Sequence, residues 1–178
     1  MYAWRMGNLV RLATALILTL ASAAGPDASH SAFQKGLKLK KGGKFAAAAK
    51  IFERLAEKDP EDAASLEQLA TLQGWLKRYD EAIGTWQKAL RLEPKSPDFH
   101  LGLSRVLYWR EDLKGAASEA LAATKLDPKR ADAWLFYGDV LLAQNQGADA
   151  RKAYETARAL APDDPEPAQK LARLQQSK

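Results

Sequence analysis

The sequence predicts an all-α fold, a solenoid of about four helix-turn-helix units of roughly 34 residues each, followed by one capping helix. The first observation behind this prediction is the spacing of Pro60, Pro94, Pro128 and Pro162, which recur at one constant interval without slippage. The second is that small and large apolar residues recur at fixed offsets between these prolines, on one face of each expected helix. A single helical hairpin cannot bury its apolar face alone, so such units stack on one another. We therefore expect function on a surface, not in an enclosed catalytic pocket.

The first unit is expected over residues 29–62, after an entry segment at 25–28 that we expect to be disordered. Its two helices carry apolar or small residues at helical spacing: Ala32, Gly36 and Leu39, then Ala48, Phe52 and Leu55. Lys35 stands at the place where the later units have Leu69, Leu103 and Tyr137. This unit is therefore expected to have the thinnest core.

The next three units are expected over residues 63–96, 97–130 and 131–164. Their first helices carry the same buried stripe, formed by Leu66, Leu69 and Ala70, by His100, Leu103, Ser104 and Leu107, and by Trp134, Tyr137, Gly138 and Leu141. Their second helices carry Ala82, Trp86 and Ala89, then Ala116, Ala120 and Ala123, then Ala150, Tyr154 and Ala157. The small residues Gly36, Ala70, Ser104 and Gly138 share one offset, which predicts a close approach of the two helices in every unit.

The prolines and the tail mark where helices end. A proline lacks the N–H and has a fixed φ, so it stops a helix at or just before the preceding residue. Residues 165–178 are expected to form a capping helix, because Ala168, Leu171 and Ala172 fall at first-helix offsets before the chain becomes polar. An open-ended array needs such a polar end for solubility.

These proline, small-residue and aromatic offsets resemble the tetratricopeptide repeat family from about Ser29 to Asp164. The resemblance implies a right-handed α-solenoid in which the first helices line a concave face, and it implies a protein or peptide partner. One unit departs from the pattern, because Gly147 replaces the large residue found as Phe45, Tyr79 and Leu113. The stretch from Leu103 to Trp109, with Leu113 and Ala116 after it, is similar to repeats of bacterial envelope and polysaccharide-export proteins.

Residues 1–24 are interpreted as a secretory signal peptide. Arg5 and Arg11 precede an apolar run from Leu12 to Ala24 that ends in small residues. This run is shorter than the ~20 residues of a membrane span. We expect cleavage after Ala23 or Ala24, which leads to a periplasmic or secreted protein, with a Gram-negative bacterium as the favoured source. The alternative is an uncleaved segment kept as an anchor.

Composition argues against catalysis. The chain has no cysteine, and its formal charge of +5 falls to +3 once two arginines leave with the signal segment. His30 and His100 are far apart in the sequence, which indicates neither a metal pair nor a general base. There is also no glycine-rich phosphate loop. The sequence therefore predicts no enzyme activity, no cofactor and no metal site.

The concave face supplies the predicted partner-binding residues. Trp75 and Trp109 occupy the same place in adjacent units, and Arg105 lies nearby on the same face. Large aromatic and arginine side chains are typical of binding hot spots. The alternative is that both indoles pack against a neighbouring helical pair. The full set of predicted partner-binding residues is Trp75, Asp98, Leu101, Arg105, Tyr108, Trp109, Leu135 and Asp139.

Two functional hypotheses follow. The first is an exported scaffold or adaptor that binds a peptide or protein partner in a cell-envelope assembly. The alternative is a glycan-binding module in polysaccharide export or cell-wall biogenesis, with Trp75, Tyr108 and Trp109 stacking on sugar rings and Asp98, Arg105 and Asp139 bonding hydroxyls. Nucleic acid is not an expected partner, and a membrane is expected only through a partner or an uncleaved signal segment.

A lysine cluster in the first unit has two interpretations. Lys35, Lys38, Lys40, Lys41 and Lys44 follow one another closely in the sequence. Clustered cations can attract anionic lipid head groups or an acidic partner. The alternative is a solvated helix face.

Overall fold

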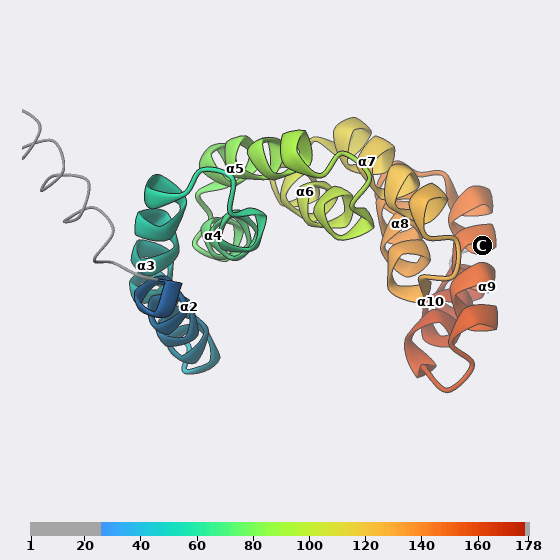
Figure 1. Cartoon of the computed structure of the whole chain (residues 1–178). Coiled ribbons are helices and arrows are strands. Elements are labelled where there is room, and N and C mark those ends of the chain that lie inside the picture. Colours follow the sequence, from blue (N-terminus) through green and yellow to red (C-terminus); the bar gives the residue numbers. More distant parts are fainter. Residues whose placement is uncertain (1–25, 177–178) are drawn as a thin grey trace, which may run out of the picture.

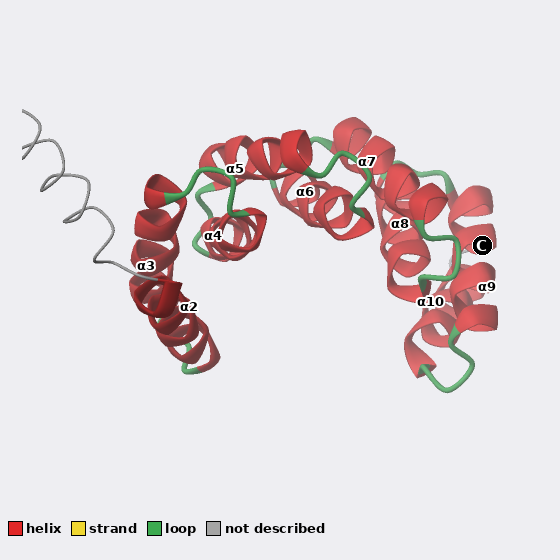
Figure 2. Cartoon of the chain, in the orientation of Figure 1, coloured by secondary structure: helices red, strands yellow, loops and turns green. Residues whose placement is uncertain are grey.

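The computed structural model describes residues 26–176, and within this range the chain forms nine α-helices joined by short turns (Figures 1 and 2). Their bounds, with the labels of Figure 1, are α2 Pro26–Lys41, α3 Phe45–Lys58, α4 Ala63–Trp75, α5 Tyr79–Leu92, α6 Pro97–Trp109, α7 Leu113–Leu126, α8 Ala131–Ala143, α9 Gly147–Leu160 and α10 Pro165–Gln176. The predicted signal peptide, residues 1–24, lies outside the described residues.

The helices form an arch of stacked hairpins, and each helix packs mainly on the one before it and the one after it. In Figure 1, α4 and α6 lie on the inner side of the arch, and α5 and α7 run along its outer side. The single helix α10 packs on α9 at the C-terminal end. This arrangement confirms the predicted all-α solenoid of about four units with a terminal cap.

The first helix begins earlier than the sequence analysis expected. Residues 26–28, expected to be part of a disordered entry, lie in α2, and so does His30. Proline is favoured in the first turn of a helix, where its missing N–H would have no partner anyway. Pro26, the first residue that the structure describes, is compatible with the first turn of α2.

Three helix starts are capped by the side chain that precedes them. The Ser65 N–H donates to Asp62 Oδ1 at 3.1 Å, and the Gly115 N–H donates to Asp112 Oδ1 at 3.0 Å. The Phe99 N–H donates to Ser96 Oγ at 3.4 Å. A cap of this kind contributes about 1 kcal/mol, so these contacts help to fix where α4, α6 and α7 begin.

The turn inside each hairpin has one repeated backbone geometry. Gly43, Lys77, Glu111 and Asn145 recur at the same interval as the prolines, and all have positive φ, between 60° and 72°. In each turn the next residue's N–H bonds back to a carbonyl five residues earlier, for example Arg78 N to Gln73 O at 2.9 Å. This is the pattern of a helix end closed by a left-handed residue. Glycine fills the position only in the first hairpin.

Glycine at two of these turn positions is expected to stabilise the protein. Lys77 and Glu111 are exposed and hold a left-handed conformation that costs about 1–2 kcal/mol in residues with a Cβ. Lys77→Gly and Glu111→Gly should each relieve this cost. Glycine loses more entropy on folding, which offsets part of the gain, so the free energy of unfolding should rise by about 0.5–1 kcal/mol in each variant. Urea titration followed by circular dichroism measures this change. A lower urea midpoint in both variants would contradict the role assigned to the turns.

Close contacts at the small-residue offset hold three of the hairpins together. A Cβ atom at Gly36 would lie 2.6 Å from Phe52 Cζ, and one at Gly138 would lie 2.5 Å from Tyr154 Cε1. In the third unit, where the second helix has alanine in place of an aromatic residue, Ser104 Oγ donates to the Ala116 carbonyl at 2.6 Å. The shared small-residue offset therefore does mark a close helix approach.

The first unit has the thinnest core, as expected. Gly36 is the one buried residue among those of α2 whose side chains are described, whereas α4 buries seven residues, Leu66 and Leu69 among them. Phe33 still contacts Phe52 edge to face at 5.2 Å between ring centroids. The hairpin thus depends more on α3 and α4 than on its own first helix.

Candidate functional site

A pocket of about 140 Å³ lies on the inner face, between α4 and α6. Its lining residues are Glu67, Thr71, Trp75, Trp86, Asp98, Leu101, Gly102, Arg105, Val106, Trp109 and Arg130. Five of the eight residues predicted to bind a partner are among them. The repeat register therefore brings side chains from two successive units to one place.

The two tryptophans are both packed and open. Trp75 is 44% exposed and Trp109 is 40% exposed, although each also contacts the preceding unit. The Trp75 ring meets Phe45 edge to face at 5.0 Å, and the Trp109 ring would lie 3.0 Å from a Cβ atom at Gly74. The packing interpretation of this pair is thus partly right, and its role in partner binding stays a prediction. Packing fixes each ring from one side and leaves the rest of it available to a ligand.

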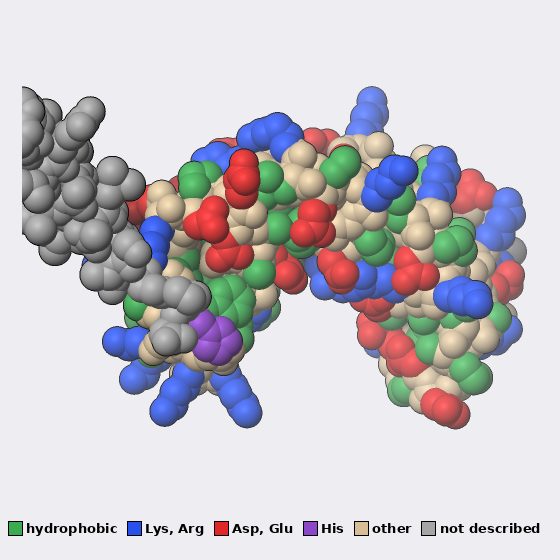
Figure 3. All heavy atoms as spheres, viewed as in Figure 1, with side chains coloured by type: hydrophobic (Ala, Val, Ile, Leu, Met, Phe, Trp, Pro, Cys, Tyr) green, Lys and Arg blue, Asp and Glu red, His purple; other side chains and the backbone are tan. Residues whose placement is uncertain are grey.

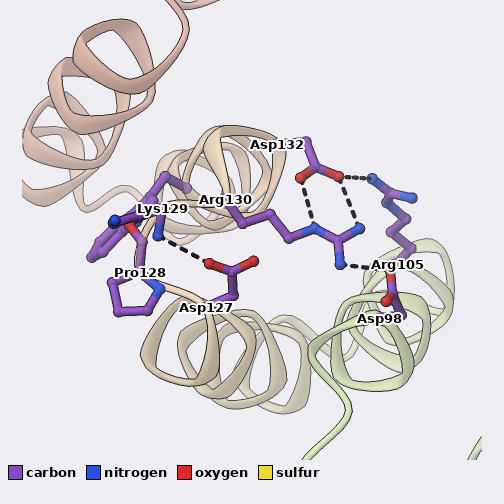
Figure 4. A network of polar contacts seen from close by, with 8 residues as sticks. Asp98, Arg105, Asp127, Pro128, Lys129, Arg130 and Asp132 are labelled. Atoms are coloured by element: carbon purple, nitrogen blue, oxygen red, sulfur yellow. Dashed lines mark hydrogen bonds and ion pairs between the residues drawn. The ribbon is translucent and has the colours of Figure 1, made fainter.

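Ion pairs cross the seam between the third and fourth units beside the pocket (Figure 4). Arg130 donates to Asp98 Oδ1 at 2.6 Å and to Asp132 Oδ1 at 2.8 Å. Arg105 lies 3.5 Å from Asp132 and 5.7 Å from the Phe136 ring. The hydrogen bond with Asp132, and then that with Asp98, raises the pKa of Arg130. Both arginines of the pocket are therefore already paired with carboxylates.

Glu67 is the pocket residue with an unpaired charge. It makes no hydrogen bond or ion pair within residues 26–176. Burial raises the pKa of Glu67, and the nearby Asp98 and Glu93 raise it further, while Lys40 opposes them. A half-buried carboxylate without a partner is unfavourable for folding. Such a group is typical of a site that is completed by a ligand.

Replacing Glu67 with glutamine is expected to stabilise the free protein. The raised pKa means that the folded chain binds this proton more tightly than the unfolded chain, so ionised Glu67 opposes folding. Glu67→Gln should therefore raise the urea midpoint at pH 7. The gain should vanish below the ordinary carboxyl pKa of 4.5, where both states carry the proton. A lower midpoint at pH 7 would contradict this description of Glu67.

One predicted residue, Leu101, is not exposed. It is 1% exposed and packs with Ala123 and Ala133, with Phe136 beside them. The expectation that Leu101 points into the groove was wrong, because its side chain fills the seam where the following unit packs on α6. It touches the pocket only as part of the wall.

Tyr108, Leu135 and Asp139 lie outside this pocket. Tyr108 is half-buried against Phe136, with ring centroids 5.7 Å apart, and Leu135 packs against the core cluster around Tyr154 and Leu171. Asp139 accepts hydrogen bonds from Tyr154 Oη at 2.8 Å and from Lys170 Nζ at 2.7 Å. These three side chains contact other side chains of the chain itself, and their role in partner binding stays a prediction.

The sequence analysis missed several residues of the pocket, above all Glu67, Trp86 and Arg130. Trp86 was assigned to the buried stripe of a second helix, and it is indeed 3% exposed. It reaches the pocket because Gly102 stands where the other units have Gln34, Gln68 and Phe136. This glycine was the feature of the sequence that could have predicted the contact, because a missing side chain on α6 leaves room for a large ring from α5.

The lysine cluster is split by the structure. Lys40 Nζ donates to Gln68 Oε1 at 2.7 Å and lies 5.1 Å from the centre of the Trp75 ring. Burial lowers the pKa of Lys40, against the opposing effect of Glu67. Lys35, Lys38, Lys41 and Lys44 are at least partly exposed at the α2 end of the arch, where Figure 3 shows basic side chains projecting together. Lys40 is thus held against Gln68 and the Trp75 ring, apart from the four exposed lysines.

Family models of the tetratricopeptide repeat match residues 33–73 and 76–128, which is more than half of the chain, and residues 110–174. The chain belongs to the tetratricopeptide repeat family. Repeats of this family stack into solenoids with extended concave binding surfaces, and they serve as scaffolds for proteins and peptides. In the described part of this family member, no group of three histidine, cysteine or acidic side chains is placed to hold a metal. No described helix has the length and apolar character needed to cross a membrane.

Solved structures and a curated protein are similar to this tetratricopeptide repeat chain. TTC0263 from Thermus thermophilus is 26% identical with a TM-score of 0.71, covering 84% of this chain and 82% of that one. The first tetratricopeptide domain of Spaghetti (RPAP3), bound to an HSP90 peptide, is 23% identical with a TM-score of 0.63, covering 67% of this chain and 94% of that one. The mouse protein O-mannosyl-transferase TMTC1 is 28% identical over 134 residues, 71% of this chain. The chain spans only 14% of that protein's length.

Proposed function

We propose that this tetratricopeptide repeat protein is an exported scaffold that binds a segment of a partner protein in the pocket between Trp75 and Trp109, within a cell-envelope assembly. The observation that carries the binding site is the pair of open indoles held one unit apart on the inner face. The Spaghetti (RPAP3) domain bound to an HSP90 peptide supports a peptide as the class of ligand. The apolar run at residues 12–24 supports export.

A glycan partner is supported less well. The polar residues assigned to sugar hydroxyls were Asp98, Arg105 and Asp139. Asp98 is bonded to Arg130, Arg105 is paired with Asp132, and Asp139 accepts from Tyr154 and Lys170. A sugar would have to displace these charged contacts to use them. A peptide can bind through the indole rings and leave the ion pairs intact.

Photo-crosslinking tests the binding site. A photoreactive residue at position 71, which lines the pocket, should capture a protein from intact cells. The same residue at the exposed position 126, on outer helix α7, is the matched control and should capture far less of it. Adding Trp109→Ala and Arg105→Ala should weaken capture at position 71, whereas Leu126→Ala with Arg158→Ala should not. Equal capture from both positions would overturn the proposed site.

Cell fractionation and the intact mass of the purified protein test the export proposal. Expressed with its full sequence in a Gram-negative host, the protein should be found in the periplasm. Intact mass should correspond to a chain that begins at Ala24 or Gly25, because small residues precede both bonds. Recovery in the cytoplasm with residues 1–24 still attached would rule out the export proposal.

A further inference from the structure

We infer that the pocket between Trp75 and Trp109 takes a basic side chain, lysine or arginine, from the bound segment, with Glu67 as its counter-charge. This inference rests on the proposed function and specifies the chemistry of the partner. Three independent features of the pocket carry it: a carboxylate without a hydrogen bond or ion pair, the repeat register of its cation–ring contacts, and an unpaired indole N–H in its wall.

The way in which the charged groups of the pocket are paired favours a cationic ligand. Its acidic groups are Glu67 and Asp98, and its basic groups are Arg105 and Arg130. Arg130 is bonded to Asp98 and Asp132, and Arg105 is paired with Asp132, so an anionic ligand would have to compete with carboxylates already in place. Glu67 makes no hydrogen bond or ion pair in the described chain, and only the charge of Lys40 favours its ionised form. A ligand cation would pair with it and offset part of the cost of its burial.

The groups facing Glu67 reinforce this preference. Asp98 on α6 and Glu93 after α5 are acidic and disfavour its ionised form, and Lys40 on α2 is the one basic residue that offsets them. Lys40 is held by Gln68 and by the Trp75 ring, and it forms no ion pair with Glu67. A ligand cation would therefore meet Glu67, Asp98 and Glu93, with Lys40 nearby and with Arg105 and Arg130 already paired with carboxylates.

The repeat register shows where a ligand cation can lie. The ammonium of Lys40 lies 5.1 Å from the centre of the Trp75 ring. Gly74 holds the place of Lys40 in the next unit, so the chain supplies no cation from that place to the equivalent ring, Trp109. Aromatic faces attract ammonium and guanidinium groups within about 6 Å. The Trp109 ring thus lacks the cation that Lys40 supplies to Trp75, and a ligand cation can take the equivalent place.

The wall of the pocket also has a donor without an acceptor. Trp86 is 3% exposed and lines the pocket, and its Nε1 has no hydrogen-bond partner in the part of the chain that the structure describes. A Cβ atom at Gly102 would lie 2.7 Å from Trp86 Cε2, the ring carbon bonded to this nitrogen. Leaving a buried donor unpaired is unfavourable. A backbone carbonyl of the bound segment would satisfy it once the covering side chains shift.

Nuclear magnetic resonance of the indole N–H groups in the ¹⁵N-labelled full chain tests this inference directly. The probes are the N-acetyl amides of lysine and arginine, with the N-acetyl amides of norleucine and glutamate as the neutral and acidic comparisons. The basic probes should shift the Trp75, Trp86 and Trp109 signals, identified with Trp→Phe variants, in a saturable way. Cation–ring and ion-pair energies predict binding about tenfold tighter than for norleucine amide.

A matched pair of variants locates the charge effect. Glu67→Gln should bring the lysine and norleucine probes to within about twofold of each other, because the remaining cation–ring term is small. Glu155→Gln removes the same charge from an exposed position on α9 and should leave the tenfold preference unchanged. Equal binding of the lysine and norleucine probes to the unmodified chain, tighter binding of the glutamate probe, or no shift of Trp75 and Trp109 would each overturn the inference.

The outcome for the proposed function is read separately. Capture of a protein at position 71 but not at position 126 would keep the proposed function, even if the basic probes showed no preference. Preferential binding of basic probes without capture would instead count against a protein partner at this site and leave the cation pocket standing.

Discussion

Replacing Tyr154 with alanine is expected to lower the free energy of unfolding by about 3–5 kcal/mol. The ring is fully buried, it lies against Gly138 on the partner helix of its hairpin, and it belongs to the core cluster shared with α10. The neighbours cannot fill the resulting cavity, since Gly138 has no side chain. Urea unfolding of the variant and the unmodified chain, followed by far-ultraviolet circular dichroism, measures the difference.

The conservative variant Tyr154→Phe separates packing from hydrogen bonding. Burial, with the hydrogen bond to Asp139 next, raises the pKa of the Tyr154 phenol, which therefore remains a donor at neutral pH. Losing this bond should lower the free energy of unfolding by only about 1–2 kcal/mol, because Asp139 keeps a second hydrogen bond, from Lys170. If the alanine and phenylalanine variants had the same stability, the ring would not be the element that holds the hairpin together.

Substituting valine for Gly102 is the second large effect we expect. The first added atom, Cβ, would lie 2.3 Å from Trp86 Cζ2, and the Trp86 ring is buried and contacts Phe99 at 5.7 Å between centroids. The added atoms would force the packed ring out of its place, so overpacking should cost about 1–3 kcal/mol. The variant should also disturb the pocket, because Gly102 and Trp86 both line it. Urea unfolding and the Trp86 indole N–H signal report these two effects.

Gly84→Ala is the control for helix propensity. Gly84 lies inside α5, and a Cβ atom there would have no neighbour within 4 Å. Alanine is favoured over glycine in a helix interior by about 0.5–1 kcal/mol, so this variant should be more stable than the unmodified chain. A loss of stability at position 84 similar to that at position 102 would mean that the Trp86 contact is not the cause.

The sequence was sufficient for the fold because every unit repeats the same physical constraints. Pro94 and its equivalents end the second helices, and Gly36 and Gly138 meet the large rings that the shared offset predicts. Positions 43, 77, 111 and 145 could not be recognised as left-handed turns from residue type, since only the first is glycine. Their geometry comes from closing the hairpin, which overrides local preference at Lys77 and Glu111.

The binding face was predicted less completely because exposure depends on the neighbouring unit. Trp75 and Trp109 were identified from their equivalent places, which the arch does bring to one pocket. Leu101 occupies an outward place in its own helix, yet the seam with the fourth unit buries it. Glu67 was not among the predicted partner-binding residues, because a lone acidic residue in a sequence gives no indication that it lacks an ion-pair partner. Only the assembled neighbours show that.

The geometry also suggests a compromise between stability and binding at Glu67. Ionised Glu67 is unfavourable in the free protein, and the same charge is what a basic ligand would neutralise. Proteins commonly retain such locally unfavourable groups where function requires them. The expected signature is a single substitution, Glu67→Gln, that raises the urea midpoint and removes the preference for basic probes.

Hydrogen–deuterium exchange of the full chain, with and without the protein captured at position 71, is the most direct test of the inner face as the binding surface. We predict slower exchange on binding in α4 and α6, with the indole-bearing ends at Trp75 and Trp109 affected most, and no change in α5 and α7. Protection confined to the outer helices α5 and α7 would contradict the account.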